Sequence, residues 1–357
     1  IYTKYSSRLS VIHDQDRPWI VYKVVDARSI YEMPGSAVTK DANERVLIAK
    51  AKLQVRNTLK KLAKRKTFKN LSDDELLFSR LLEEVPGKRK TVYAKAAENF
   101  RDQRGQKNYY RQGIVDGSKY MSEMEEIFAH HDLPVELVRL PLVESSFNEA
   151  AQSKVGASGI WQFMQGTGRY YMHVNEKLDE RNSPIKATEA AAKLFKSNFS
   201  LLKDWPLAVT AYNHGAGGLI KASKKLKTTS LNEIIFKYKS KSFSFASQNF
   251  YAEFLAALHG ERYQQEVFGS LVKHPPMAAD MVALKKNMRV REVAEITGVT
   301  LEELKLYNPD VKKLISSGNP FLPQGYKVRL PLGRSARLEL YFQQADELRS
   351  AATPATI

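Results

Sequence analysis

Apolar residues recur at helical spacing through most of the chain, and this pattern predicts a mainly α-helical protein. From about Asp41 they fall at steps of three and four residues, at Leu47, Ile48, Ala51, Val55, Leu59 and Leu62. The same spacing follows Lys119, at Tyr120, Met124, Ile127 and Phe128. It returns in 183–202, at Ala191, Leu194, Phe195, Phe199 and Leu202. Segments 206–215 and 249–263 read as further helices, so we expect 117–265 to form one all-helical domain.

Capping residues and prolines indicate where several of these helices begin and end. Ser72 with Glu75 and Thr300 with Glu303 have the spacing of capping boxes, and the first opens a helix that we expect to stop at Pro86. Proline removes a backbone donor, so Pro141 predicts a kink or an end in the helix that follows Pro134. Glu144 is then expected at or near the C-terminal end of a helix.

Strand-like patterns are few and short. "RPWIVYKVV" at 17–25 predicts one strand near the N-terminus, and 280–286 and 325–331 predict two more around a pair of helices, in the order β-α-α-β. Paired prolines in "VKHPPMAAD" favour an extended linker. We therefore expect five parts: a mostly helical accessory region 1–116, the helical domain 117–265, a linker 266–280, a small module 281–333 and a helical tail 334–357.

The amino-acid composition limits the kinds of site and partner that the chain can have. The chain of 357 residues has no cysteine, which excludes disulfides and thiolate sites, and no apolar run approaches the roughly 20 residues that span a bilayer. The start, "IYTKYSSRLS", lacks the apolar core of a signal peptide, so we expect a soluble chain whose targeting segment has been removed or left out. A net charge of +17 favours a polyanionic partner: nucleic acid, anionic lipid or an acidic cell-wall polymer.

Motifs for metals, nucleotides and nucleic acids are absent from the sequence. The histidines at 130, 131, 173 and 214 lack metal-site spacing, there is no HExxH, and no phosphate-binding glycine loop occurs. A basic nucleic-acid binder has only the charge in its favour. We expect no metal, no cofactor and no nucleic-acid partner.

Three stretches combine reactive side chains with permissive backbone. They are "PLVESSFNEAAQSKV", "GASGIWQFMQGTG" and "AYNHGAGG". Their candidate site residues are Glu144, Ser145, Ser153, Gln162, Met164, Tyr212 and Asn213. Taken singly, each has an ordinary explanation: Glu144 as a surface charge, Met164 and Trp161 as core residues, and Asn213 as a cap of its own turn. Only their combination in this order indicates a site.

In order, "LPLVESSFN", "GASGIWQFMQGTG", "DERNSP", "ATEAAAKLF" and "WPLAVTAYNHGAGG" resemble lytic transglycosylases with a goose-type lysozyme fold, glycoside hydrolase family 23 with its SLT domain. The chain is most similar to the D-type membrane-bound branch, which often carries LysM modules. The unit at about 281–331 resembles a LysM through "ITGVTLEELKLYNP" and "YKVRLP". Since "KKNMRV" stands where a Gly-Asp-Thr turn is usual, either glycan binding or a packing role remains open for it.

The resemblance implies a role for each site residue. Glu144 would be the acid and the base, with Ser145, Ser153 and Gln162 lining the site. Met164, Tyr212 and Asn213 would shape or hydrogen-bond the saccharide groove. The family usually has a tyrosine in a motif of the form Asn-Tyr-Val-Pro-Lys near the site. Here "NFYAEF" puts Phe250 at that place and Tyr251 one residue later, about 100° around a helix.

The resemblance implies cleavage of peptidoglycan glycan strands without water, between N-acetylmuramic acid and N-acetylglucosamine, leaving 1,6-anhydro ends. A goose-type hydrolase is the alternative, and it would need a second carboxylate. Asp179 and Glu180 are candidates, although we favour pairing with Arg181 or a capping role for them. A non-catalytic cell-wall binding protein is a third possibility. We expect a periplasmic or outer-membrane-associated protein with no required oligomer, and the sequence leaves open whether a lipid anchor lies upstream of Ile1.

Overall fold

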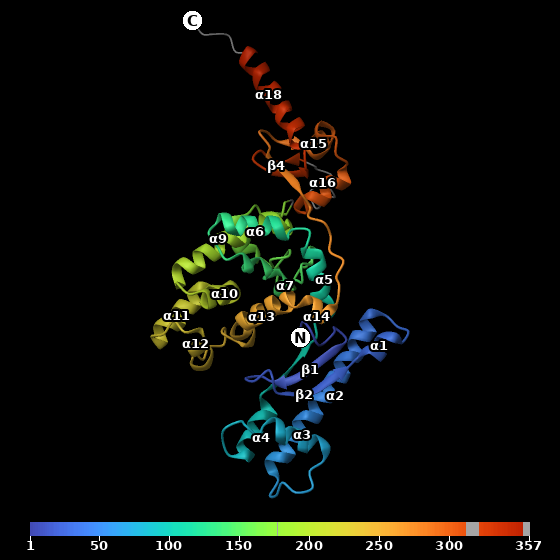
Figure 1. Ribbon diagram of the computed structural model, residues 1–357, viewed down its shortest axis with the longest axis vertical. Coiled ribbons are helices and arrows are strands. Elements are labelled where there is room, and N and C mark those ends of the chain that lie inside the picture. The colour runs from blue at the N-terminus through green and yellow to red at the C-terminus, as the bar shows by residue number, and fades with distance from the viewer. Residues whose placement is uncertain (177, 312–320, 353–357) are drawn as a thin grey trace. The chain divides into compact units, whose positions relative to one another are not determined.

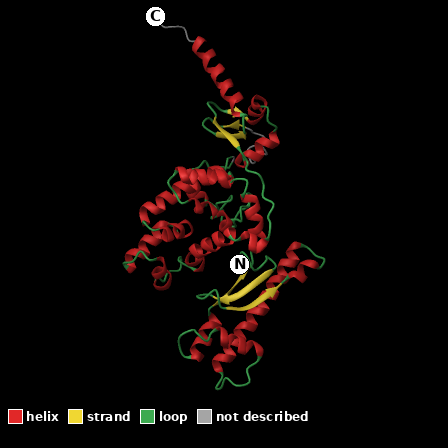
Figure 2. Ribbon diagram, viewed as in Figure 1, coloured by secondary structure: helices red, strands yellow, loops and turns green. Residues whose placement is uncertain are grey.

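The computed structural model describes residues 1–176, 178–311 and 321–352, and it is mainly helical (Figures 1 and 2). These residues form two compact units. One comprises Ile1–Gln112 with His259–Gly269, and the other comprises Gly113–Leu258 with the chain from Ser270 on. Our five-part division is finer than these two units and stays a prediction.

The first unit contains a three-stranded antiparallel sheet in the order β2-β1-β3. Its strands are β1 (Leu9–Asp14), β2 (Val21–Asp26) and β3 (Phe100–Arg104). Val11 lies opposite Val24 on one side and Gln103 on the other. The strand predicted within 17–25 is confirmed as β2, whereas β1 and β3 were not predicted. β3, "FRDQR", has one apolar residue, and its pairing with a strand about ninety positions earlier leaves no local signal.

The first unit also contains helices, and several of them pack on the sheet and on each other. They are α1 (Arg28–Glu32), α2 (Ala37–Lys64), α3 (Asp73–Leu81), α4 (Arg89–Glu98) and α14 (Gln264–Phe268). α2 buries Ala51, Val55, Leu59 and Leu62, the face predicted from its spacing. The capping box of Ser72 is present, but α3 ends at Leu81, before the proline at which we expected it to stop. α14 spans the predicted boundary between the helical domain, which we expected to end at 265, and the linker, which we expected to begin at 266.

The second unit begins with helices that enclose one aromatic core. They are α5 (Lys107–Gly117), α6 (Met121–His130), α7 (Pro141–Glu144), α8 (Gln165–Tyr171), α9 (Pro184–Leu202), α10 (Trp205–His214), α11 (Ala216–Leu226), α12 (Leu231–Lys237) and α13 (Phe245–Arg262). α5 and α13 each cross the border between the units. Trp161 is fully buried and stacks on Phe128, with ring centroids 5.9 Å apart. Phe195 stacks on Tyr212 at 5.2 Å.

Pro141 starts a helix instead of kinking one. A 3₁₀ segment, η1 (Val135–Arg139), precedes it, and Pro141 then occupies the first turn of α7, where its missing N–H costs nothing. Of the two outcomes predicted for Pro141, a kink or an end, the structure shows an end: the segment after Pro134 stops at Arg139, and Glu144 at a helix C-terminus is confirmed.

The chain ends in a small module, here called the C-terminal module (279–352). Its strands are β4 (Ala279–Ala283), β5 (Met288–Arg289), β6 (Phe321–Leu322) and β7 (Lys327–Pro331). Its helical segments are α15 (Val290–Thr297), α16 (Leu301–Tyr307), η3 (Pro309–Val311) and α18 (Ser335–Ala352). β4 pairs antiparallel with β7 around α15 and α16, so the predicted β-α-α-β order is confirmed. The helical tail is confirmed as α18, and 353–357 lie outside the described residues.

Candidate active site

Glu144 is a recessed carboxyl at the end of α7. Its side chain is half-buried, and in the described part of the chain no hydrogen bond or ion pair engages it. Leu142 and Phe147 beside it are buried. Removal from water raises the pKa of Glu144 from 4.5 to about 8, with a smaller contribution from the nearby Glu253 carboxylate. Glu144 is therefore protonated at neutral pH and can act as an acid.

Glu253 was not among the site residues predicted from the sequence. It lies on α13, three residues after Phe250, and its negative charge adds to burial in raising the pKa of Glu144. A signal was present: aligned with the motif Asn-Tyr-Val-Pro-Lys, Asn249–Glu253 ends in an acid where the motif has a base. This reversal of charge brings a second carboxylate near Glu144.

Tyr212, on α10, supplies a neutral hydroxyl next to Glu144. Burial and the charge of Glu144 raise the pKa of Tyr212 well above its ordinary value, so the hydroxyl keeps its proton. It donates to the carbonyl oxygen of Trp161 at 2.7 Å. Because Trp161 is locked in the core, this bond fixes the end of α10 against the glycine-rich loop.

That loop runs from Ser153 to Phe163, and polar side chains within it and before it bond to its backbone. Ser145 Oγ donates to Ile160 O at 2.8 Å, joining the residue after Glu144 to the loop. Ser153 Oγ accepts from Ala157 N at 2.8 Å and closes the turn. Gln162 Nε2 donates to the carbonyl oxygens of Ala151 and Gly159.

Ser145, Ser153 and Gln162 therefore support the loop, the first from the end of α7 and the other two from within it. We predicted that these side chains contact substrate. In the structure the polar group of each one bonds to backbone. Met164 differs, since it caps the start of α8 and its side chain is 45% exposed. Of the loop residues singled out, Met164 is the one most open to a ligand.

The remaining predicted residues lie on α10 and α13. Asn213 is exposed, and its Oδ1 accepts from Ser247 Oγ at 2.9 Å. Phe250 is buried. Tyr251 packs against the apolar cluster of α10, α11 and α12, and burial followed by the charge of Asp204 raises its pKa. The one-residue step thus turns Tyr251 toward this cluster, and it does not act on Glu144.

The carboxylates considered as a second catalytic group are used structurally, as we favoured. Asp179 binds the Arg181 guanidinium through both oxygens, at 2.9 and 2.7 Å, and accepts from Arg181 N. Glu180 lies 3.3 Å from Lys186 Nζ and accepts from His173 N. Neither contributes to the raised pKa of Glu144. Glu253 is the carboxylate to consider in their place.

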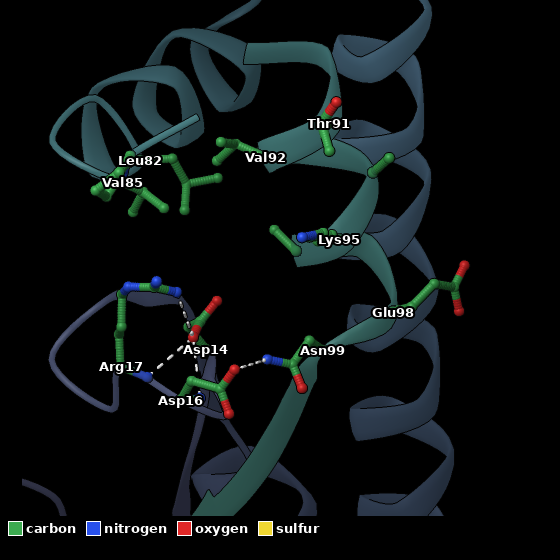
Figure 3. Close-up of a pocket in the computed structure, with 13 residues that line it drawn as sticks. Asp14, Asp16, Arg17, Leu82, Val85, Thr91, Val92, Lys95, Glu98 and Asn99 are labelled. Carbon is green, nitrogen blue, oxygen red and sulfur yellow. Dashed lines mark hydrogen bonds and ion pairs between the residues drawn. The ribbon is translucent and has the colours of Figure 1, made fainter. Parts of the chain in front are cut away.

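A hollow of about 680 Å³ in the first unit is a second place where polar groups gather (Figure 3). Asp14 and Asp16 lie on one side, with Lys95 and apolar side chains around them. The Asp14 carboxylate already accepts from Asp16 N, Arg17 N and the Tyr22 hydroxyl. Asp16 accepts from Asn99 at 2.8 Å. These bonds support the turn after β1, and we assign no chemistry to the hollow.

Within 1–176, 178–311 and 321–352, no group of three or more His, Asp or Glu side chains is placed to hold a metal ion. Across the same ranges, no helix is both long and apolar enough to cross a bilayer.

The raised pKa of Glu144 predicts how activity changes with pH. A general acid must be protonated, so activity should be full below pH 8 and fall as the pH rises through about 8. Glu253→Gln removes one cause and leaves burial, so the falling limb should move to lower pH without reaching 4.5. The measurement is a pH–rate profile on soluble glycan fragments.

A matched control for this profile is Glu266→Gln, an exposed carboxylate on α14 that does not act on Glu144. Its falling limb should coincide with that of the unaltered chain. If Glu253→Gln also left the limb in place, the electrostatic coupling between Glu253 and Glu144 would be wrong.

Comparison with known proteins matches two segments of the chain to family models. Residues 121–235 match the family described as the transglycosylase SLT domain, and residues 278–343 match the LysM-like domain of lytic transglycosylase MltD. This chain therefore carries a lysozyme-like SLT domain followed by a LysM-like domain, and the resemblance stated from its motifs is confirmed.

Two curated proteins are similar to parts of this chain. Membrane-bound lytic murein transglycosylase D of Escherichia coli (strain K12) is 29% identical over 216 residues, which cover 58% of this chain and 46% of that protein. A protein of Alteromonas sp. (strain M-1), named for tributyltin chloride resistance, is 33% identical over 111 residues, 30% of this chain and 53% of its own. The chain thus spans about half the length of the curated relatives it matches.

Proposed function

We propose that this chain is a peptidoglycan lytic transglycosylase that cleaves the β-1,4 bond between N-acetylmuramic acid and N-acetylglucosamine. The observation that carries the proposal is the carboxyl of Glu144, recessed, protonated at neutral pH and placed beside the neutral hydroxyl of Tyr212. The SLT match over 121–235 and the likeness to a murein transglycosylase support the same substrate.

One carboxyl group can complete the reaction in two proton transfers. Protonated Glu144 gives its proton to the glycosidic oxygen while the bond from that oxygen to C1 breaks. The N-acetyl group of the substrate stabilises the positive charge that develops at C1. Ionised Glu144 then takes the proton of the C6 hydroxyl, whose oxygen bonds to C1 and closes the 1,6-anhydro ring. Glu144 ends protonated again, and no water is consumed.

Glu253 gives the hydrolase alternative a specific basis. A glycosidase that activates water needs a second carboxylate, commonly about 5 to 10 Å from the first. Glu253 is close enough to Glu144 to raise its pKa, and it stands where the related motif has lysine. In this alternative Glu253 would orient or deprotonate water, and the product would carry a reducing end.

Product mass separates the two reactions. Purified sacculi are digested with the chain in water enriched in ¹⁸O, and the soluble muropeptides are analysed by mass spectrometry. We expect anhydro ends, lighter by one water and free of ¹⁸O. Reducing ends carrying ¹⁸O would establish the hydrolase instead, and the absence of any release would favour a non-catalytic cell-wall protein. Glu144→Gln serves as the blank.

The expected setting follows from the substrate. We place the protein in the periplasm or at the outer membrane, where peptidoglycan lies, and the printed name of the Escherichia coli relative describes a membrane-bound protein. The net charge of +17 suits an acidic wall polymer. Activity without an oligomer remains a prediction, and the sequence leaves a lipid anchor upstream of Ile1 open. The location can be tested by fractionating cells and detecting the chain in each fraction with an antibody.

A further inference from the structure

Residues 178–183 lie between the C-terminal module and the glycine-rich loop 153–163, and they contact both. All three belong to the second unit of the chain. The segment follows α8 and includes the short 3₁₀ turn η2 (Glu180–Asn182). It contains the two carboxylates that the sequence offered as catalytic candidates, so their actual contacts show what the segment does.

On the module side, the segment takes part in the core of its neighbour. Leu178 is 4% exposed and belongs to the apolar cluster of the C-terminal module, with Val293, Leu304 and Val328 among its members. Asp179 N donates to Asp310 O at 3.4 Å. A side chain from the SLT domain thus completes the core of the module.

A buried lysine reinforces this contact. Lys186, in the first turn of α9, lies 2.8 Å from Asp310 Oδ2 of the module and 3.3 Å from Glu180 Oε1. Its ammonium nitrogen also sits 3.6 Å from the centre of the Tyr326 ring. Lys186 is 9% exposed and Asp310 is 2% exposed. Buried charges are stable only when they are paired, so the lysine of one domain and the aspartate of the other require each other.

A second ion pair and the linker extend the docking surface. Arg329 of β7 is 3% exposed and donates from Nη2 to Glu123 Oε2 of α6 at 2.8 Å. The linker is fastened alongside, because Met277 N donates to Lys119 O at 2.8 Å. The C-terminal module is therefore packed onto the SLT domain and not merely tethered to it.

On the loop side, the same segment supports the glycine-rich loop. Asp179 orients the Arg181 guanidinium, whose Nη1 donates to Gly156 O at 2.7 Å and to Phe163 O at 2.9 Å. One arginine nitrogen thus joins two points of the loop. Ser158 Oγ adds a bond to Asn182 Oδ1 at 2.7 Å.

The loop connects this support to the carboxyl that we assign to catalysis. Ser145, the residue after Glu144, donates to Ile160 O in the middle of the loop. Tyr212 donates to Trp161 O. A continuous series of contacts therefore runs from Asp310 of the module through the 178–183 segment and the loop to the neighbours of Glu144.

We propose that the C-terminal module acts as an internal brace of the active site. By docking on Leu178, Lys186 and Glu123, it holds the 178–183 segment, and through Arg181 it holds the glycine-rich loop beside Glu144. Lys186 and Arg181 are then positioning residues. The effect on catalysis rests on the proposed function, whereas the bracing of the loop does not.

The test is amide hydrogen–deuterium exchange on the full chain without substrate, comparing Lys186→Met with the unaltered protein. Loss of the buried cation leaves two carboxylates facing each other, so exchange should rise at least about tenfold both in the module and at 156–163. Lys193→Met, an exposed lysine on the same helix, should change neither. Lys186→Arg keeps a cation that can stack on Tyr326 and should restore protection of the loop.

Loosening of the module with an unchanged loop would overturn the proposal, as would an unchanged module. If Lys186→Met does not fold, Glu123→Gln, which removes only the partner of Arg329, gives the same readout with a smaller expected rise of about threefold. Equal exchange in that variant and the unaltered chain would also overturn it.

Turnover of soluble glycan fragments, measured in parallel, should fall with Lys186→Met and recover with Lys186→Arg. An unaltered chain without activity on sacculi would defeat the proposed function and leave the exchange result standing. The two failures are therefore distinguishable.

Discussion

Replacing Glu144 with glutamine should reduce the release of anhydro-muropeptides by at least about a thousandfold, because general acid and base catalysis by one positioned group contributes roughly 10²–10⁴-fold to each proton transfer. Glutamine has nearly the same shape but can neither give the first proton nor take the second. The measurement is the initial rate of muropeptide release from sacculi, with products identified by mass. Full activity in Glu144→Gln would exclude Glu144 as the acid.

The same variant should be more stable than the unaltered chain at alkaline pH, which separates loss of chemistry from loss of fold. A carboxyl whose folded pKa is raised from 4.5 to about 8 contributes stability below pH 4.5 that is lost as the pH rises through 8. That difference corresponds to at most about 5 kcal/mol. Because Glu144 is only half-buried and water reaches part of its side chain, we expect a gain of about 1–2 kcal/mol above pH 8.

Urea unfolding at pH 5 and pH 9 measures this gain. The midpoint of Glu144→Gln should match that of the unaltered chain more closely at pH 5 than at pH 9, where it should be higher. A lower midpoint at both pH values would mean that the variant damages the fold, and its inactivity would then say nothing about Glu144.

Replacing Gly159 with alanine should destabilise the SLT domain by about 3 kcal/mol or more, the size expected when a buried substitution forces backbone to move. Gly159 has φ +76°, and a β-carbon there would lie 1.8 Å from the carbonyl oxygen of Arg181. The collision is with backbone of the 178–183 segment, which docking of the C-terminal module holds in place. Urea unfolding at neutral pH measures the loss.

Gly156→Ala is the matched control in the same loop. Gly156 has φ +92°, but a β-carbon there meets nothing within 4 Å. Alanine should cost only the left-handed backbone penalty of about 1–2 kcal/mol. Equal losses in the two variants would show that backbone conformation alone, and not the close approach to Arg181, explains why glycine is needed at 159.

Local signals in the sequence predicted the helices and the small C-terminal fold. A helix is closed by bonds between residues four apart, so the apolar face of α2 and the capping boxes at Ser72 and Thr300 could be recognised without any distant partner. The motif that contains Glu144 identified the family for the same reason, since its residues lie within short stretches of chain. The role of Glu144 as the catalytic carboxyl could therefore be predicted from the sequence through the family resemblance.

Contacts between distant segments were decided only by the tertiary structure. β1 and β3 pair across about ninety positions, so β3 had no pattern of its own. The proximity of Glu253 to Glu144 depends on how α13 packs. The pKa of about 8 for Glu144 results mainly from its burial, which cannot be read from the sequence.

The "DERNSP" stretch shows the same division between sequence and structure. The sequence determined that Asp179 and Arg181 are near neighbours and would pair. Only the fold brought Asp310 next to Lys186, 124 positions away in the sequence. This contact gives the Asp179–Arg181 pair a function beyond local capping. Spacing along the chain specifies which residues share a helix face, whereas burial and long-range electrostatics arise only when separate elements pack together and exclude water from between them.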